Sequence, residues 1–169
     1  MTSRSVLKSL IVVMLVLCAG SAFAQAPPAP SPYLTPIGPA ISLENAKKAA
    51  AAALAEARKN GWLMVVAVVS TGGYLVYYEK MDNTQLGSAD VAIEKARSAA
   101  LYKRPTKAFQ DAVEKGGVNL RVFALKGAVP VEGGLPIIID GKLVGAIGLS
   151  GDLSEHDGQC AKAGVDALK

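Results

Sequence analysis

The chain has 169 residues, and 18 lysines and arginines stand against 14 aspartates and glutamates, which gives a formal charge of +4. Hydrophobic residues make up 51% of the sequence, enough for a full core in one domain. A charge this close to balance argues against a nucleic-acid partner.

Residues 1–24 have the pattern of a secretory signal peptide. Arg4 and Lys8 precede an apolar run, Leu10 to Ala19, that is too short to form a stable membrane helix. Ala22-Phe23-Ala24 then matches a cleavage site of the A-x-A type. We therefore predict a periplasmic or secreted protein, with no stable membrane anchor after cleavage. Removing the two basic residues lowers the formal charge to +2.

Residues 25–41 are rich in proline and show neither a helical pattern nor strand alternation, so we predict an extended arm before a domain at 42–169. Two interpretations of this arm stay open. It is either a disordered spacer after the signal, as chain ends often are, or a segment that docks on a neighbouring subunit. The apolar side chains available for such docking are Tyr33, Leu34 and Ile37.

The first half of the domain predicts a helix followed by a strand pair. Small apolar residues recur at helical spacing over residues 42–60, with Ser42 placed to cap the helix and Gly61 to end it. The apolar, β-branched run Met64–Val69 predicts a strand buried on both faces. Thr71-Gly72-Gly73 turns the chain into an antiparallel partner at 74–79.

The middle of the domain predicts two helices that meet at a proline. Ser88 is placed to cap the first helix, which ends at Pro105. Thr106 is placed to cap a shorter helix that runs to about Lys115. The segment that follows, 120–125, is interpreted as a short strand or an irregular crossing.

The last third of the domain carries the clearest turn signal in the chain. Asp140-Gly141 between strands 136–140 and 142–149 predicts a hairpin with a type I′ turn. Gly145 and Gly148 lie inside the second strand, where a glycine indicates that another backbone, a partner or a ligand comes close.

A last helix is expected from about Ser154 to the end of the chain. Cys160 lies on this helix and is the one cysteine left after signal cleavage. It is either buried, free or paired between chains, and we favour burial on the inner face of the helix. Together the elements predict an α+β fold with α/β/α layers around an antiparallel sheet.

Sequence motifs of known catalytic sites are absent. The chain has no G-x-S-x-G, no H-E-x-x-H, no C-x-x-C and no phosphate-binding glycine loop. No acid–base pair or nucleophile stands out from the pattern. A binding protein without enzymatic activity is therefore favoured over an enzyme.

One cluster of candidate binding residues lies where the two middle helices meet. It joins cations, an aromatic ring and a hydroxyl: Arg97, Tyr102, Lys103, Arg104 and Thr106. A helix start offers free backbone N–H groups to an anion, and arginine or lysine can neutralise a carboxylate. Two interpretations stay open: a capped helix with solvated charges, or a clamp for a carboxylate or propionate group.

A second cluster lies at the start of the last helix, around His156 and Asp157. His156 is the only histidine of the chain, and imidazole is the commonest metal-binding side chain. The alternatives are a metal or anion site with His156 as a ligand, or a surface histidine at a helix start.

Several ordered motifs resemble the GlcG/HbpS family, also called the haem-degrading domain family. The resemblance spans about residues 42–169. The matching motifs are Tyr78-Glu79-Lys80-Met81-Asp82, Ala92-Ile93-Glu94-Lys95-Ala96-Arg97, Arg104-Pro105-Thr106, Gly133-Gly134-Leu135-Pro136-Ile137, Gly145-Ala146-Ile147-Gly148-Leu149-Ser150-Gly151, and Asp157 with Ala161-Lys162-Ala163-Gly164.

The resemblance implies a profilin-like fold with a five-stranded antiparallel sheet flanked by helices, and assembly into dimers up to octamers. It also implies haem as a cofactor, with the threonine of the R-P-T motif, here Thr106, as an iron ligand. A histidine that binds iron near the start of another family member has no equivalent here, because His156 lies in the last helix.

Three functions follow as hypotheses. The first is an exported haem-binding protein that assists haem degradation, iron protection or redox sensing. The second is a binding, sensor or accessory module for a small organic acid, as in glycolate metabolism, placed at Arg104–Thr106. The third is an oligomeric scaffold without a ligand, in which Gly145 and Gly148 are close subunit contacts.

Overall fold

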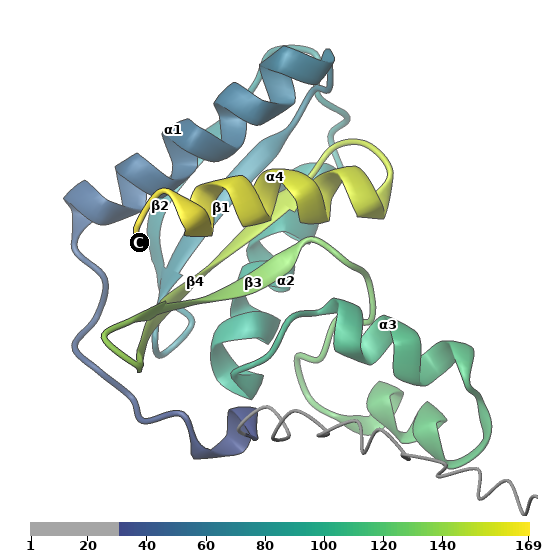
Figure 1. Cartoon of the computed structure of the whole chain (residues 1–169). Helices are drawn as coiled ribbons and strands as arrows, with labels where there is room; N and C mark the ends of the chain where they lie inside the picture. The colour runs from purple at the N-terminus through teal and green to yellow at the C-terminus, as the bar shows by residue number, and fades with distance from the viewer. Residues whose placement is uncertain (1–30) are drawn as a thin grey trace, which may run out of the picture.

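A four-stranded antiparallel sheet forms the middle layer of the computed structural model, which describes residues 31–169. Its strand order is β2-β1-β4-β3, with α1 and α4 on one face and α2 on the other (Figure 1). The predicted α+β class with α/β/α layers is confirmed. The elements are α1 (Leu43–Asn60), β1 (Val65–Ser70), β2 (Leu75–Lys80), α2 (Ser88–Tyr102), α3 (Lys107–Glu114), β3 (Gly134–Ile139), β4 (Lys142–Ser150) and α4 (Ser154–Asp166), with short 3-10 helices η1 (Pro32–Leu34) and η2 (Gly117–Ala124).

The expected fifth strand is wrong. Residues 120–125 lie mostly within η2, where Val122 is the buried side chain. The segment follows Gly116 and Gly117, both at positive φ (63° and 58°), and its side chains do not alternate between a buried and an exposed face as a strand requires. The sheet therefore has four strands.

Both predicted hairpins form. β1 is buried on both faces and pairs with β2 on one side and with β4 on the other. β3 pairs with β4 across Asp140 and Gly141, whose φ angles of 50° and 73° are the two positive values that a type I′ turn needs. The two inner strands of the sheet therefore carry most of its buried surface.

Of the three helix caps that the sequence predicts, one forms. Ser42 Oγ accepts the N–H of Asn45 at 3.2 Å, and Gly61 ends α1 in the left-handed conformation. The cap at Ser88 is wrong, because the N-cap residue of α2 is Gly87. Thr106 is the N-cap residue of α3 as predicted, but its side chain makes no hydrogen bond to the first turn. Both hydroxyls are buried and hold partners elsewhere: Ser88 accepts from Ser150, and Thr106 accepts from Gly134.

α2 lies close to the sheet because both surfaces are made of very small residues. A Cβ added at Gly148 of β4 would lie 2.1 Å from the carbonyl oxygen of Ala92 and 2.5 Å from the nitrogen of Ala96. One at Gly145 would lie 2.4 Å from the carbonyl oxygen of Val69. The predicted close approach is thus made by backbone of the same chain. The interpretation of these glycines as subunit contacts is wrong.

Residues 31–41 of the arm lie before α1, and part of this segment runs along β4. Gly38 donates its N–H to the carbonyl of Leu143 at 2.7 Å, and Leu143 donates its N–H to the carbonyl of Pro36 at 2.8 Å. Ile37 forms an isolated parallel bridge with Leu143. A disordered spacer is therefore wrong for residues 31–41. Docking on a neighbouring subunit stays a prediction for the exposed side chains Tyr33, Leu34 and Ile37.

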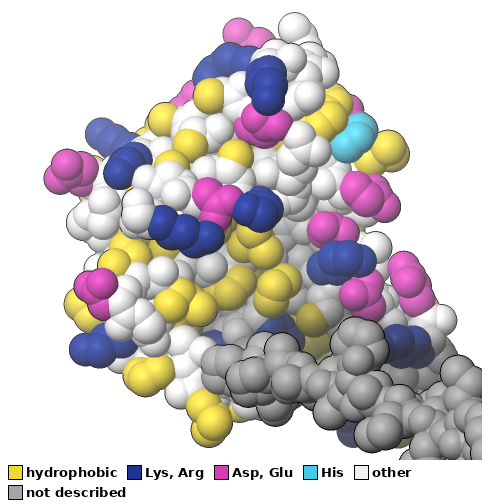
Figure 2. Space-filling model, viewed as in Figure 1, with side chains coloured by type: hydrophobic (Ala, Val, Ile, Leu, Met, Phe, Trp, Pro, Cys, Tyr) yellow, Lys and Arg dark blue, Asp and Glu magenta, His cyan; other side chains and the backbone are white. Residues whose placement is uncertain are grey.

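The predicted signal peptide, residues 1–24, lies outside the described residues and stays a prediction. Among residues 31–169, no helix combines the length and the apolar character needed to cross a membrane. Lysine and arginine side chains are interspersed with aspartate and glutamate over the face shown in Figure 2.

The contact between α2 and β4 can be tested with a single methyl group. We expect Gly148→Ala to lower the free energy of unfolding by about 3 kcal/mol or to prevent folding, because the new Cβ meets rigid backbone. The matched control is Gly87→Ala, whose Cβ would have open space around it and whose φ is already helical. The control should change stability by no more than about 0.5 kcal/mol. Equal denaturant midpoints for the two variants would contradict the packing described.

Cys160 is buried on α4, as the sequence predicts. Burial raises the pKa of its thiol to about 12, with smaller contributions from Glu56, Asp157 and Asp152. Because the thiolate is the reactive form, we expect the folded protein at about pH 8 to react very slowly with a thiol reagent such as DTNB. The same protein in guanidinium chloride should react at the rate of a free cysteine. Fast labelling of the folded protein would show that the helix opens or that the thiol is accessible.

Candidate functional site

The corner between α2 and α3 projects a small lobe from the edge of the layers. α2 ends at Lys103, which takes the left-handed conformation (φ 53°), and Pro105 prevents the helix from resuming. α3 then packs against η2 rather than against the sheet (Figure 1). The lobe therefore has its own narrow interior, formed mainly by Phe109 of α3 and Val122 of η2.

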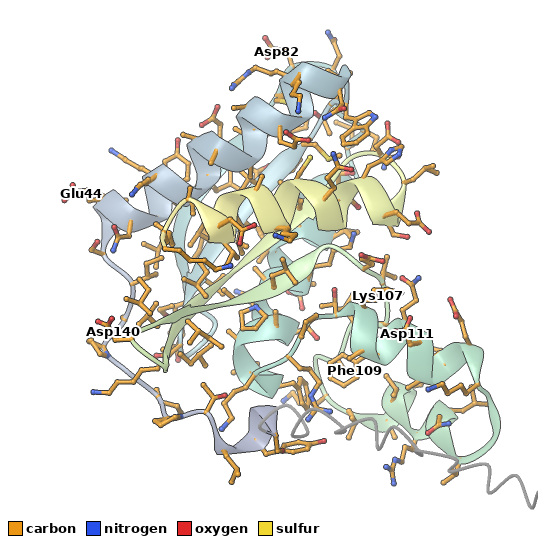
Figure 3. All side chains as sticks on the ribbon, viewed as in Figure 1. Glu44, Asp82, Lys107, Phe109, Asp111 and Asp140 are labelled. Atoms are coloured by element: carbon orange, nitrogen blue, oxygen red, sulfur yellow. The ribbon has the colours of Figure 1, made fainter. Side chains whose placement is uncertain are left out.

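A cavity of about 460 Å³ opens between this lobe and the N-terminal arm. Figure 3 shows Phe109 on the side of α3 that faces η2, whereas Lys107 and Asp111 form an ion pair on the outer side. The lining combines aromatic and aliphatic side chains with two arginines and an asparagine: Tyr33, Tyr102, Arg104, Phe109, Asn119, Arg121, Val122 and Leu125, with Ala108 and Ala112. An apolar slot with a few polar groups is typical of small-molecule sites.

Arg104 is held in this cavity by aromatic rings. Its guanidinium carbon lies 4.3 Å from the centre of the Tyr33 ring and 5.3 Å from that of Phe109. Nε donates to the carbonyl of Tyr102 at 3.1 Å, which fixes the plane of the guanidinium. The other guanidinium N–H groups make no hydrogen bond within the described residues, so they are available to an acidic ligand.

Tyr102 forms another wall of the cavity. Its ring meets Phe109 edge-on, with centres 5.2 Å apart and planes at 83°. Its hydroxyl donates to the carbonyl of Lys126 at 2.8 Å, so the ring also fastens the segment after η2 to the corner. The wall is consequently rigid on the side of α2.

The predicted clamp is only partly assembled at the cavity. Tyr102 and Arg104 line it, but Lys103 Nζ donates to the carbonyls of Tyr33 and Thr35 at 2.7 and 3.0 Å and so holds the arm. Arg97 lies elsewhere: it donates to the carbonyl of Gly73 and pairs with Glu94 at 2.7 Å. Arg97 and Lys103 therefore serve structural contacts in the described chain.

Thr106 does not line the cavity, and 0% of its surface is exposed. Its Oγ1 accepts the N–H of Gly134 at 2.9 Å, and its own N–H donates to the carbonyl of Gly134 at 3.0 Å. An iron atom at this oxygen would have to displace that contact. The role of Thr106 as a metal ligand stays a prediction.

His156 has a different environment from the cavity. Its ring stacks on Trp62, with centres 3.9 Å apart and planes at 11°, and Nδ1 lies 2.8 Å from Asp152 Oδ1. The N–H of Leu153, and then His156, lower the pKa of the Asp152 carboxyl. Residues 31–169 contain no group of three or more histidine, cysteine, aspartate or glutamate side chains placed to hold a metal ion. Iron binding by His156 also stays a prediction.

Of the ten lining residues, only Tyr102 and Arg104 were assigned to a site from the sequence; those that were missed include Tyr33, Phe109 and Arg121. Phe109 had a detectable signal, since it is the one aromatic residue of a short amphipathic helix. Tyr33 had no such signal, because it lies about seventy positions before Arg104 in the sequence and the path of the arm brings the two side chains together.

Comparison with known proteins identifies relatives over most of the described chain. Protein GlcG of Escherichia coli (strain K12) is 37% identical over 110 residues, which are 65% of this chain and 81% of GlcG. An uncharacterized 15.0 kDa protein of Citrobacter freundii, from the dhaT-dhaS intergenic region, is 34% identical over 130 residues, 76% of this chain and 92% of that protein.

Solved structures have the same fold. HbpS superposes with a TM-score of 0.71 at 29% identity, covering 78% of this chain and 92% of HbpS. The PduOC:haem complex superposes with a TM-score of 0.69 at 28% identity, covering 76% of this chain and 94% of that one. The family described as "Haem degrading protein HbpS-like" matches residues 41–166. This chain belongs to that family, the HbpS-like haem degrading proteins.

Proposed function

We propose that this chain is an exported haem-binding protein and that the haem lies in the cavity between α3, η2 and the arm. The observation that carries the proposal is Arg104, presented by two aromatic rings in an otherwise largely apolar slot. A solved relative in complex with haem supports the choice of ligand.

The lining of the cavity suits the parts of a haem that a protein must recognise. Arg104 and Arg121 would neutralise the propionates, and Phe109, Val122 and Leu125 would contact the porphyrin. Tyr33 supplies a phenol oxygen, a group that binds haem iron in some proteins, whereas the hydroxyl of Tyr102 already donates to the carbonyl of Lys126. Bound haem would supply a redox-active iron at this place.

The residues of the chain favour holding haem over transforming it. Around the cavity, the described side chains include no histidine, cysteine, aspartate or glutamate placed to donate or accept a proton. Tyr102 and Arg104 orient the ligand and keep it from water. We therefore place the protein as a carrier that protects iron or passes haem to a degradation or redox-sensing partner.

A small carboxylate is the second candidate ligand. Two arginines on one cavity favour any acidic guest, and 460 Å³ also holds a short organic acid. We also propose a homo-oligomer, because large apolar side chains of η1 and η2 are exposed, among them Leu34, Val118 and Phe123.

The role of Arg104 can be measured by titrating the mature, haem-free protein with hemin and following the Soret band. We expect Arg104→Gln to weaken binding about tenfold to a hundredfold, because a charge-assisted hydrogen bond to a propionate is lost. Arg97→Gln is the matched control, since Arg97 contacts Gly73 and Glu94. The proposal fails if wild-type protein shows no Soret shift, or if both variants bind like wild type. A set of small carboxylates in the same titration tests the second ligand.

Thr106 separates a structural role from iron ligation. Thr106→Val keeps the shape but leaves the buried N–H of Gly134 without its acceptor, so we expect the free energy of unfolding to fall by about 1–3 kcal/mol. The Soret maximum of the haem-loaded variant should match that of wild type. A shifted maximum together with weaker binding would instead identify Thr106 as the iron ligand.

Export predicts the first residue of the mature protein. We expect mass spectrometry of protein recovered from the periplasm or the medium to show a chain that starts at Gln25. Full-length chain recovered from the cytoplasm as the main species would contradict export.

A further inference from the structure

A second cavity, of about 410 Å³, lies where α2 and α4 begin. It is at the opposite end of α2 from the proposed haem site and shares no lining residue with it. A buried ion pair, Lys95 of α2 with Asp157 of α4, forms part of its wall. The two serines Ser88 and Ser150 form another part.

Lys95 is an unusual group to find in this wall. Its side chain is 1% exposed, and Nζ donates to Asp157 Oδ2 at 2.6 Å. An ammonium group has three N–H donors, and within residues 31–169 Nζ makes this one hydrogen bond. Because an unmade hydrogen bond of a buried charge is costly, the remaining donors call for an acceptor in the cavity.

Asp157 has spare capacity of the opposite kind. Its Oδ1 accepts a long hydrogen bond, 3.4 Å, from the N–H of Asp152, while Oδ2 accepts from Lys95. A carboxylate has about four acceptor sites, so lone pairs remain on both oxygens. Burial raises the pKa of this carboxyl, against the opposing effect of Lys95. A ligand hydroxyl that accepts from Lys95 can therefore also donate to Asp157.

The serines add a further donor, and the rim is apolar. The hydroxyl of Ser150 donates to Ser88 Oγ at 3.1 Å. The hydroxyl proton of Ser88 is not needed for this bond, so it can be donated to a ligand. Val91 and Val131 lie at the cavity with exposed fractions of 38% and 40%. They offer contact to a short carbon chain.

The charges around the cavity select an uncharged ligand. The ammonium of Lys95 and the carboxylate of Asp157 cancel each other. The positive helix ends already have acidic residues in their first turns: Asp90 in α2, and Glu155 and Asp157 in α4. Asp152 adds a negative charge at the rim, paired with His156. A carboxylate would meet Asp152 and Asp157, and an amine would meet Lys95.

We propose that this cavity binds a small, uncharged, hydroxylated compound, such as a short polyol, through a hydroxyl shared between Lys95 and Asp157. Ser88 binds a second oxygen, and Val91 and Val131 cover the carbon chain. The site is independent of haem, since none of its residues lines the first cavity.

The test uses ¹⁵N-labelled, haem-free mature protein and two-dimensional NMR, with glycerol as the probe and with glycolate and ethanolamine as charged counterparts. We expect glycerol to shift the amide signals near Ser88, Lys95 and Ser150 in a saturable way, with glycolate and ethanolamine binding at least tenfold more weakly. No saturable shift with glycerol, or tighter binding of either charged compound, would overturn the proposal.

A substitution at the exposed edge of the cavity tests the site without destabilising the buried ion pair. Lys95→Met would leave Asp157 buried without its partner, so it is not used. Val131→Phe fills the mouth of the cavity without touching the ion pair, and it should abolish the glycerol shifts. Val118→Phe is the matched control, because Val118 is exposed on η2 and lies outside this cavity. Unchanged glycerol binding in Val131→Phe would place the binding elsewhere and refute the assignment.

Discussion

The depth at which α2 rests on the sheet is the constraint on which the rest of the structure depends. Gly148 of β4 leaves room for the backbone of α2 at Ala92 and Ala96, so helix and strand meet with no side chain between them. Since α2 is one rigid rod, this contact also sets the position of its two ends. The C-terminal end carries the corner with Arg104, and the middle of the helix brings Lys95 to Asp157.

The two cavities along α2 differ in the charge of the ligand that each favours. At the C-terminal end the arginines are not neutralised by carboxylates of the lining, so that cavity favours an acidic guest. In the second cavity the ammonium of Lys95 lies 2.6 Å from its counter-ion Asp157, and what remains is hydrogen-bonding capacity without net charge. The helix α2 thus contributes both to the proposed site for an acidic ligand and to the proposed site for an uncharged one, in a chain of the haem degrading family.

Local signals in the sequence predicted the strands, both hairpins and the cap at Ser42, because each depends on residues that are neighbours in the chain. Ser88 was misassigned as a cap, and Thr106 takes its predicted N-cap position without a capping hydrogen bond, because each hydroxyl has a distant partner, Ser150 or Gly134. Lys95 was missed for a related reason. Its spacing from Ala92 and Ala99 places it on the buried stripe of α2, but a lysine without a visible partner is expected in solvent. The partner, Asp157, lies 62 positions away.

The arm shows where similarity and structure define the protein differently. The match to the family model begins at residue 41, yet Tyr33 stacks on Arg104, and the carbonyls of Tyr33 and Thr35 hold Lys103. A protein trimmed to the shared region would keep its sheet and helices and lose one wall of the cavity. Affinities measured on such a shortened form would describe a cavity without the wall that Tyr33 supplies. Two relatives with the same sheet and helices can therefore differ in how long they retain a ligand, through the arm that precedes α1.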